Sequence, residues 1–242
     1  MSGYKIKFNG IDRLYDKYSW RLTKRAKQVW ETGHVLQGSY QAELEKVIAE
    51  YCNRKFAIAV GSATDGLYFA LKSLGLTSHS KIVCPTFGYI AMSGAIKRLG
   101  AKPVYVDVEQ NGNLGPLSVG LNVDAVLYAN LFGNLADYNS IKGFCDTRKI
   151  PLIEDAAQSM GAIYKKIPSG KLGDLSVFSF DPMKNLPTFG TGGMVLTDSE
   201  AHYTHITSLR RHGFGTSYEY GYNSLMSEDH CNQLLFLFSK FK

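Results

Sequence analysis

The sequence predicts an α/β fold: a three-layer αβα sandwich with a mostly parallel central sheet. Short apolar runs alternate with segments of helical periodicity from residue 55 to residue 153. The runs are almost continuously apolar, as is typical of parallel strands that helices cover on both faces. The chain has 242 residues, of which 45% are hydrophobic, so it can bury the core that such a fold needs.

Two helices are expected before the first strand. The pattern is helical from residue 13 to residue 31 and ends near Gly33. Ser39 follows a short turn, and we predict it as the N-cap of a second helix that runs to about residue 53. Apolar residues recur in this helix at steps of three and four, which predicts one buried face, formed by Leu44, Val47, Ile48 and Tyr51.

The alternation of strands and helices begins at residue 55. Strands are predicted at residues 55–60, 81–84, 103–108, 124–128 and 151–153. Helices are predicted between them at residues 64–74, 88–99 and 137–148. Because crossover helices join parallel strands, this order favours a parallel sheet with helices on both faces.

The pattern changes after Gly161. Three more strands are predicted at residues 162–164, 175–180 and 193–197, and Asp198 or Ser199 then caps a helix that runs to about residue 211. A last helix, residues 231–241, is very apolar and must be buried. We expect an N-terminal helical arm (1–34), a large domain (35–226) and the start of a truncated C-terminal helix or small domain (227–242).

The net charge of +6 favours anionic partners such as a phosphorylated cofactor or a nucleotide diphosphate. No basic block with interleaved aromatic residues is present, so nucleic acid is not expected as a partner. The sequence also shows no secretory signal and no apolar run long enough to span a bilayer. None of the 4 cysteines forms a C-x-x-C pair. These features predict a cytoplasmic protein with reduced thiols and no membrane partner.

Two polar sites follow predicted strands. Asp155 ends one strand, at the sheet edge where open α/β sheets bind ligands, although such an aspartate also commonly caps a helix or braces a loop. The Ser62-Ala63-Thr64 turn follows another strand and opens a helix, so its free N–H groups could hold a phosphate. An ordinary tight turn would look the same, and the G-x-G-x-x-G spacing of a dinucleotide site is absent.

Lys184 follows a predicted strand within the segment SFDPMKN and precedes a glycine-rich run. A lysine enclosed in a site can lose its proton and attack a carbonyl carbon, although a single lysine is more commonly structural. His202 and His205 could meet one metal ion on a helix, but no third ligand is evident and no metal site is predicted.

The ordered motifs GSAT, PTFGY, EDAAQ and SF-x-x-x-K, followed by a glycine-rich strand, resemble those of the DegT/DnrJ/EryC1/StrS aminotransferases. These are pyridoxal-phosphate enzymes of fold type I that act mainly on keto-sugar nucleotides. The resemblance extends from about Val35 to at least Asn223. It implies that residues 35–226 form the cofactor-binding large domain of this fold.

The resemblance also assigns roles to individual residues. Lys184 matches the catalytic lysine that binds the cofactor covalently, and Asp155 matches the carboxylate that pairs with the pyridine nitrogen. Tyr89 matches the aromatic residue that stacks on the ring, and Gln158 a residue near the ring hydroxyl. The matches to the phosphate site are Ser62, Ala63, Thr64 and Ser179.

Asn223 matches an asparagine that reaches the phosphate of the partner subunit, which implies a homodimer with shared sites. The implied reaction transfers an amino group, with glutamate as the expected donor, to a nucleotide-linked keto sugar in amino-sugar or surface-polysaccharide biosynthesis.

Departures from the family pattern keep other interpretations open. The chain stops at Lys242, where family members continue through a smaller domain, and Ser224-Leu225 replaces a common basic residue. One alternative is therefore a truncated, non-catalytic remnant of the fold. Another is an aminotransferase for a cyclic ketone without a nucleotide. A nucleotide-binding protein without pyridoxal phosphate is disfavoured, because neither G-x-G-x-x-G nor P-loop spacing occurs.

Overall fold

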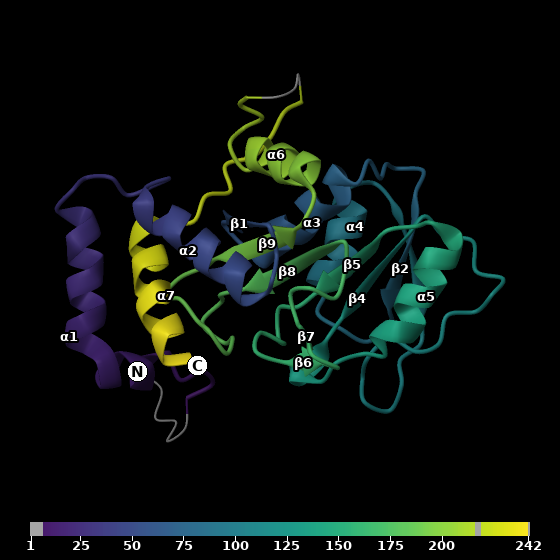
Figure 1. The fold of residues 1–242 in the computed structure, drawn as a ribbon, viewed down its shortest axis with the longest axis horizontal. Coiled ribbons are helices and arrows are strands. Elements are labelled where there is room, and N and C mark those ends of the chain that lie inside the picture. The colour runs from purple at the N-terminus through teal and green to yellow at the C-terminus, as the bar shows by residue number, and fades with distance from the viewer. Residues whose placement is uncertain (1–6, 216–218, 242) are drawn as a thin grey trace.

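The computed structural model describes residues 7–215 and 219–241 and contains a central seven-stranded sheet (Figure 1). Its spatial order is β1-β9-β8-β5-β4-β2-β3, and every strand except β9 runs parallel to the others. The strands are β1 (Phe56–Val60), β2 (Lys81–Pro85), β3 (Lys102–Val106), β4 (Ala125–Ala129), β5 (Leu152–Asp155), β8 (Leu175–Ser179) and β9 (Gly193–Thr197). The predicted mostly parallel sheet is confirmed.

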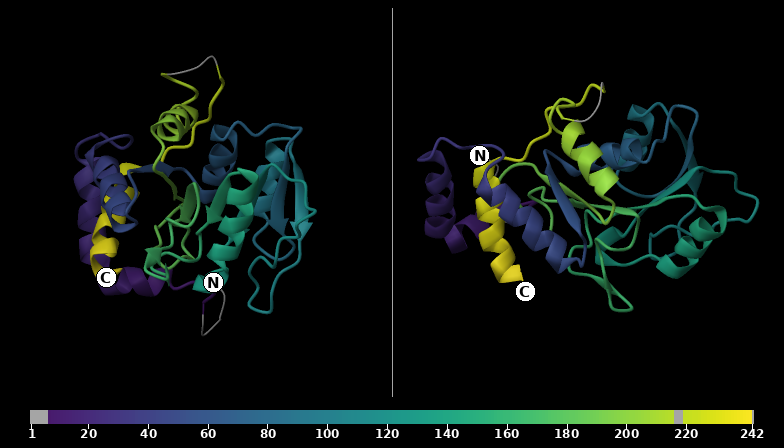
Figure 2. Two further views of the ribbon diagram at one scale, coloured as in Figure 1. Left: turned by 45° about the vertical axis from the view of Figure 1, so that its right-hand side comes forward. Right: turned by 45° about the horizontal axis from the view of Figure 1, so that its top comes forward.

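Helices cover both faces of the sheet and complete the three layers (Figures 1 and 2). One face carries α3 (Ala63–Ser73), α4 (Ala91–Arg98) and α6 (Glu200–Leu209), whose apolar side chains share a core with the sheet. The other face carries α5 (Tyr138–Arg148) over one half of the sheet. Its other half is covered by α1 (Ile11–Trp30), α2 (Ser39–Tyr51) and α7 (Glu228–Phe241).

The strand and helix positions follow the sequence prediction closely, with differences at the ends. The strand predicted to end at Glu154 and Asp155 does so as β5, although it begins at Leu152 rather than at residue 151, and the helix predicted from residue 88 begins at Ala91 as α4. Ser199, rather than Asp198, caps α6, because its side-chain oxygen accepts a hydrogen bond from the backbone N–H of His202. Two short strands, β6 (Ile163–Tyr164) and β7 (Ile167–Pro168), form a separate hairpin.

The prediction that Ser39 caps α2 is wrong. Gly38 occupies the N-cap position and offers no side chain, and Ser39 is the first helical residue. The Glu228 carboxylate caps the helix instead, because it accepts hydrogen bonds from the backbone N–H groups of Tyr40 at 3.0 Å and Gln41 at 2.9 Å. A Cβ atom at position 38 would lie 2.6 Å from Oε2 of Glu228, so glycine makes room for this cap.

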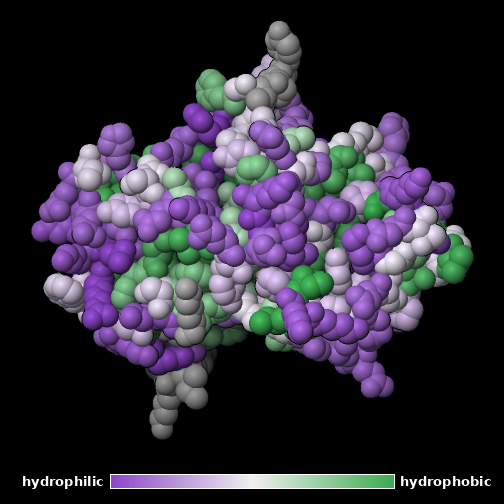
Figure 3. Space-filling view, viewed as in Figure 1, coloured by the Kyte–Doolittle hydropathy of each residue, from purple (hydrophilic) through white to green (hydrophobic). Residues whose placement is uncertain are grey.

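The apolar C-terminal helix is buried within the chain. It begins at Glu228, three residues before the predicted start, and packs between α1 and α2. Its side chains with exposed fractions below a tenth include Cys231, Leu234, Phe236, Leu237 and Phe238. Figure 3 shows that polar residues dominate the visible surface, with apolar residues in small groups.

Candidate active site at the carboxyl edge of the sheet

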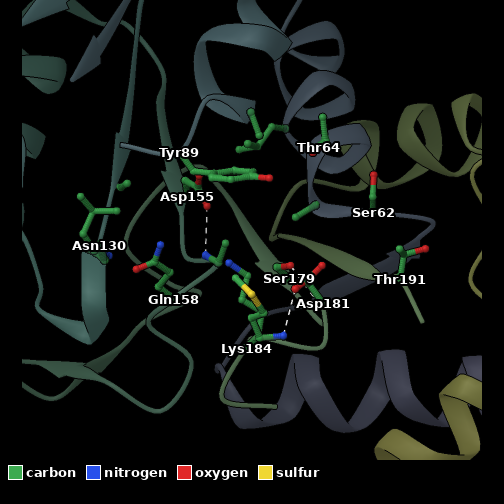
Figure 4. A pocket seen from close by; sticks show the side chains of 18 residues that line it. Ser62, Thr64, Tyr89, Asn130, Asp155, Gln158, Ser179, Asp181, Lys184 and Thr191 are labelled. Carbon is green, nitrogen blue, oxygen red and sulfur yellow. Dashed lines mark hydrogen bonds between the residues drawn. The ribbon is translucent and has the colours of Figure 1, made fainter. Parts of the chain in front are cut away.

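The loops after β1, β2, β4, β5 and β8 surround a cavity of about 400 Å³ (Figure 4). Parallel strands bring their carboxyl ends to one edge, where the chain leaves the sheet and exposes unpaired backbone groups. The cavity is lined by all but one of the predicted site residues: Ser62, Ala63, Thr64, Tyr89, Asp155, Gln158, Ser179 and Lys184. Its volume lies within the usual range of small-molecule sites.

The turn between β1 and α3 forms one wall of the cavity. Ser62 has extended backbone dihedral angles and caps α3, because its Oγ accepts a hydrogen bond from the backbone N–H of Asp65 at 3.1 Å. β9 passes close behind this turn, so a Cβ atom at Gly193 would lie 2.5 Å from the Ala63 nitrogen. The helix N-terminus therefore faces the cavity with free N–H groups, an arrangement that favours an anion.

Asp155 lies at the end of β5 and is only 6% exposed. Its Oδ1 accepts a hydrogen bond from the backbone N–H of Ala157 at 3.1 Å, and no bond to Oδ2 is found among the described residues. Burial raises the pKa of Asp155 to about 6, although the Ala157 N–H and the positive charge of Lys184 act in the opposite direction. The carboxylate can therefore still accept a proton or a hydrogen bond from a ligand.

The neighbouring Glu154 serves the fold rather than the cavity. It is fully buried, and its carboxylate accepts hydrogen bonds from the Oγ atoms of Ser169 and Ser176, from Nδ2 of Asn130, and from backbone N–H groups at Gly170 and Leu172. Side chains of successive strand residues point to opposite faces. Glu154 thus holds the loops behind β5 while Asp155 faces the cavity.

Lys184 lies on the turn that follows β8, where its backbone N–H donates to the Asp181 carbonyl at 2.9 Å. Its Nζ atom lies 5.9 Å from the centre of the Tyr89 ring, and Figure 4 shows both side chains at the same cavity. Nδ2 of Asn185 donates to the Met160 carbonyl at 2.7 Å and anchors the turn. The Tyr89 ring is 66% exposed and stands at the mouth of the cavity.

Amide side chains fix the loops on the opposite side of the cavity. Oε1 of Gln158 accepts a hydrogen bond from the backbone N–H of Phe132 at 2.8 Å. Phe132 has a φ of 57°, which is unusual for a bulky residue and requires such support. Asn130 is buried and its Oδ1 accepts a hydrogen bond from the backbone N–H of Ala136.

Asn223 is the predicted site residue that the structure does not bring to the cavity. It is exposed, and it pairs with Arg211 through an isolated antiparallel bridge. Ser224, which follows it, is buried, and its Oγ accepts a hydrogen bond from the backbone N–H of Gly61 at 3.0 Å. Asn223 is therefore held in place beside the turn after β1, but outside the cavity.

Several cavity residues were not assigned a role from the sequence. Asp181 and Thr191 line the cavity, and Oγ of Ser179 accepts a hydrogen bond from the Asp181 N–H at 3.3 Å. Both lie inside the segments that carried the Lys184 prediction, so their position in those motifs was the available signal. Ser224, which does not line the cavity but supports the turn after β1, carried no such signal, because its role depends on a contact across the fold.

The chemistry of these groups fits a flat, phosphorylated aromatic aldehyde such as pyridoxal phosphate. A lysine faces an exposed aromatic ring, a buried carboxylate has one oxygen open to the cavity, and a helix N-terminus offers N–H groups to an anion. The described residues form no cluster of three or more side chains suited to a metal ion.

The chain matches the DegT/DnrJ/EryC1/StrS aminotransferase family over residues 19–241. It is 32% identical over 226 residues to the "Pleiotropic regulatory protein" of Geobacillus stearothermophilus and covers 61% of that protein. It is 34% identical over 220 residues to the "UDP-2-acetamido-2-deoxy-3-oxo-D-glucuronate aminotransferase" of Pseudomonas aeruginosa, again over 61% of its length. These matches include 90% and 89% of the present chain.

Solved structures share the fold. S. venezuelae DesV, crystallised "in complex with ketimine intermediate", superposes with a TM-score of 0.91 at 28% sequence identity. The match covers 98% of the present chain and 66% of the DesV chain. No helix in the described ranges combines the length and apolar character required to cross a membrane.

Proposed function

Because the chain belongs to the DegT/DnrJ/EryC1/StrS aminotransferase family, we propose that it binds pyridoxal 5′-phosphate and transfers an amino group from glutamate to a nucleotide-linked keto sugar. One observation carries the proposal: Lys184, Asp155, Tyr89 and the turn at Ser62 line a single cavity. The similarity to an enzyme named for a UDP-linked 3-oxo sugar supports a substrate of this class.

When bound, pyridoxal phosphate supplies an electron sink that stabilises negative charge at the carbon bearing the amino group. Lys184 would attach the cofactor and, once released by the incoming amino acid, would carry a proton as general acid and base. Its Nζ atom lies 5.9 Å from the Tyr89 ring centre, so a ring stacked on Tyr89 would be within reach.

Asp155 and the α3 N-terminus would set the orientation of the cofactor. Oδ2 of Asp155 would accept a hydrogen bond from a protonated ring nitrogen, and the low exposure of this carboxylate strengthens such a charged pair. Backbone N–H groups of Ala63 and Thr64, with the hydroxyls of Ser62 and Ser179, would hold the phosphate. Gln158 would face the ring hydroxyl.

We also propose that two copies of the chain share their active sites, with Asn223 reaching the phosphate in the partner. Asn223 is exposed and lies outside its own cavity, while its neighbours Tyr222 and Ser224 are held against α3. A residue that is fixed in position but makes no contact with its own site is well placed to complete another copy's site.

The test is a titration of the chain with pyridoxal phosphate, followed by glutamate. We expect a visible absorbance band when the cofactor attaches, and its loss when glutamate converts the cofactor to the aminated form. Lys184→Ala should abolish both the band and transfer to keto-sugar nucleotides, while Lys97→Ala, at an exposed position on α4, should leave them unchanged. An unchanged spectrum in the Lys184→Ala protein would contradict the assignment of Lys184 as the residue that attaches the cofactor.

The same titration tests the alternative of a non-catalytic remnant. The chain spans 61% of the length of both curated relatives described above. A remnant would show weak or no attachment of the cofactor, or attachment without conversion by glutamate. Product masses from a panel of keto-sugar nucleotides and cyclic ketones would then identify the acceptor.

A further inference from the structure

The end of the cavity that would hold the phosphate has an unfavourable negative charge nearby. The charged side chains among the described lining residues are Asp155, Asp181 and Lys184, and the one cation of this set, Lys184, lies on the turn after β8 rather than on the α3 side. Asp65 lies in the first turn of α3, directly behind Ser62, and adds a negative charge there. A carboxylate at this position competes with a bound phosphate for the positive end of the helix dipole.

Arg98, at the end of α4, forms an ion pair with Asp65. Its Nη1 atom donates to Oδ1 of Asp65 at 2.5 Å, and the side chains of both residues are only about a third exposed, at 34% and 26%. The other carboxylate oxygen of Asp65 accepts a hydrogen bond from Oγ of Ser224 at 2.8 Å. Both oxygens are thus satisfied, and the carboxylate is fixed away from the cavity.

Two tyrosines hold the Arg98 guanidinium in place. Its central carbon lies 4.2 Å from the ring centre of Tyr68 and 4.5 Å from that of Tyr222. The two hydroxyls are 2.9 Å apart, and the rings meet edge to face. Such stacking restricts a long side chain that would otherwise be mobile, so the positive charge stays beside Asp65.

We propose that Arg98 is a positioning residue for the cofactor phosphate: it neutralises Asp65, so that the N-terminus of α3 can accept a dianion. Arg98 does not line the cavity and acts through Asp65. The inference rests on the proposed function, because it assumes that a phosphate binds at the Ser62 turn. It adds that the affinity of this turn is set by a charge pair outside the cavity.

The experiment measures binding of pyridoxal phosphate by absorbance and of inorganic phosphate by calorimetry. Arg98→Met should weaken both roughly fivefold at low salt, and the difference should shrink at high salt. The double variant Asp65→Asn/Arg98→Met removes both charges and should return close to wild-type affinity. Arg148→Met is the matched control, because Arg148 also stacks on an aromatic ring, at 3.8 Å from Phe144, but lies on α5.

Unfolding midpoints of all variants would show whether they fold. A purely structural role for Arg98 predicts that the double variant binds as weakly as the single variant at every salt concentration, and that result would overturn the inference. Unchanged binding in Arg98→Met would overturn it too. If wild type binds inorganic phosphate but gives no absorbance band with pyridoxal phosphate, the proposed function fails while the phosphate measurement still tests Arg98.

Discussion

At the residue scale, the burial of Asp155 opposes the ionised state that its proposed role requires. A carboxylate that is to hold a protonated ring nitrogen must be ionised, yet this one is buried at the end of β5, and burial raises its pKa to about 6. The protein without cofactor therefore carries an unfavourable buried charge at neutral pH. Functional sites commonly hold groups whose environment is chosen for the ligand rather than for the stability of the fold.

This conflict predicts how stability depends on pH. Because the pKa of Asp155 is higher in the folded chain than the ordinary value of 3.8, the folded state holds more protons between about pH 4 and pH 6. The stability that Asp155 contributes is present below that range and is lost as the pH rises through 6. Asp155→Asn should therefore stabilise the cofactor-free protein at pH 7 by roughly 2 to 3 kcal/mol, with little effect at pH 4.

Urea unfolding of both proteins at the two pH values checks this prediction. Asp16→Asn, at an exposed position on α1, should change stability equally little at both values. The same Asp155→Asn protein should bind pyridoxal phosphate poorly, because an amide cannot carry the charge that pairs with the ring nitrogen. A stability difference that is the same at pH 4 and pH 7 would contradict the assignment of the pKa shift to Asp155.

At the scale of elements, the C-terminal helix is tied to the start of α2. Glu228 is 1% exposed, and its carboxylate satisfies two of the free N–H groups at the N-terminus of α2. A negative charge there also complements the helix dipole. The contact joins segments about 190 residues apart (|i−j| of 188 and 187) and places α7 against the sheet half that carries β8 and β9.

Loss of this cap should destabilise the chain. Glu228→Ala leaves the N–H groups of Tyr40 and Gln41 without a partner, and we expect a loss of about 1 to 3 kcal/mol in the free energy of unfolding. Asp229→Ala, one residue further along α7, should cost less. Amide hydrogen exchange should speed up at residues 40 and 41 only in the Glu228→Ala protein, and equal exchange in both variants would refute the cap.

At the scale of the whole molecule, the position of Asn223 leads to a prediction about assembly. Under the proposed shared sites, a mixed dimer of Lys184→Ala and Asn223→Ala chains has one complete site, formed by Lys184 from one copy and Asn223 from the other. Equal mixing should then restore about a quarter of wild-type activity, because half of the dimers are mixed and each has one site of two. The Lys184→Ala chain alone should be inactive.

Light scattering should show the dimer independently of activity. A monomer at all concentrations, or mixtures whose activity equals the average of the separate variants, would exclude shared sites.

The division into an arm (1–34), a large domain (35–226) and a C-terminal segment (227–242) stays a prediction. The close packing of α1, α2 and α7 does show that the first and last helices share one core.

The sequence by itself determined the fold class, nearly all helices and strands, and eight of the residues that line the cavity. Such features depend on local patterns: apolar periodicity, residues at strand ends, and ordered motifs such as the segment around Lys184. The family resemblance then supplied the roles of Lys184, Asp155 and Tyr89. The motifs did not predict the distant residues that hold these side chains and loops in place.

Only the tertiary structure decided which distant groups complete each other. Glu228 replaces Ser39 as the cap of α2, Arg98 and Ser224 hold Asp65, and Asn223 lies outside the cavity. Each contact joins residues 33 or more positions apart in the chain. A local pattern contains no information about such pairs, because these residues come within hydrogen-bonding distance only when the sheet brings the loops together.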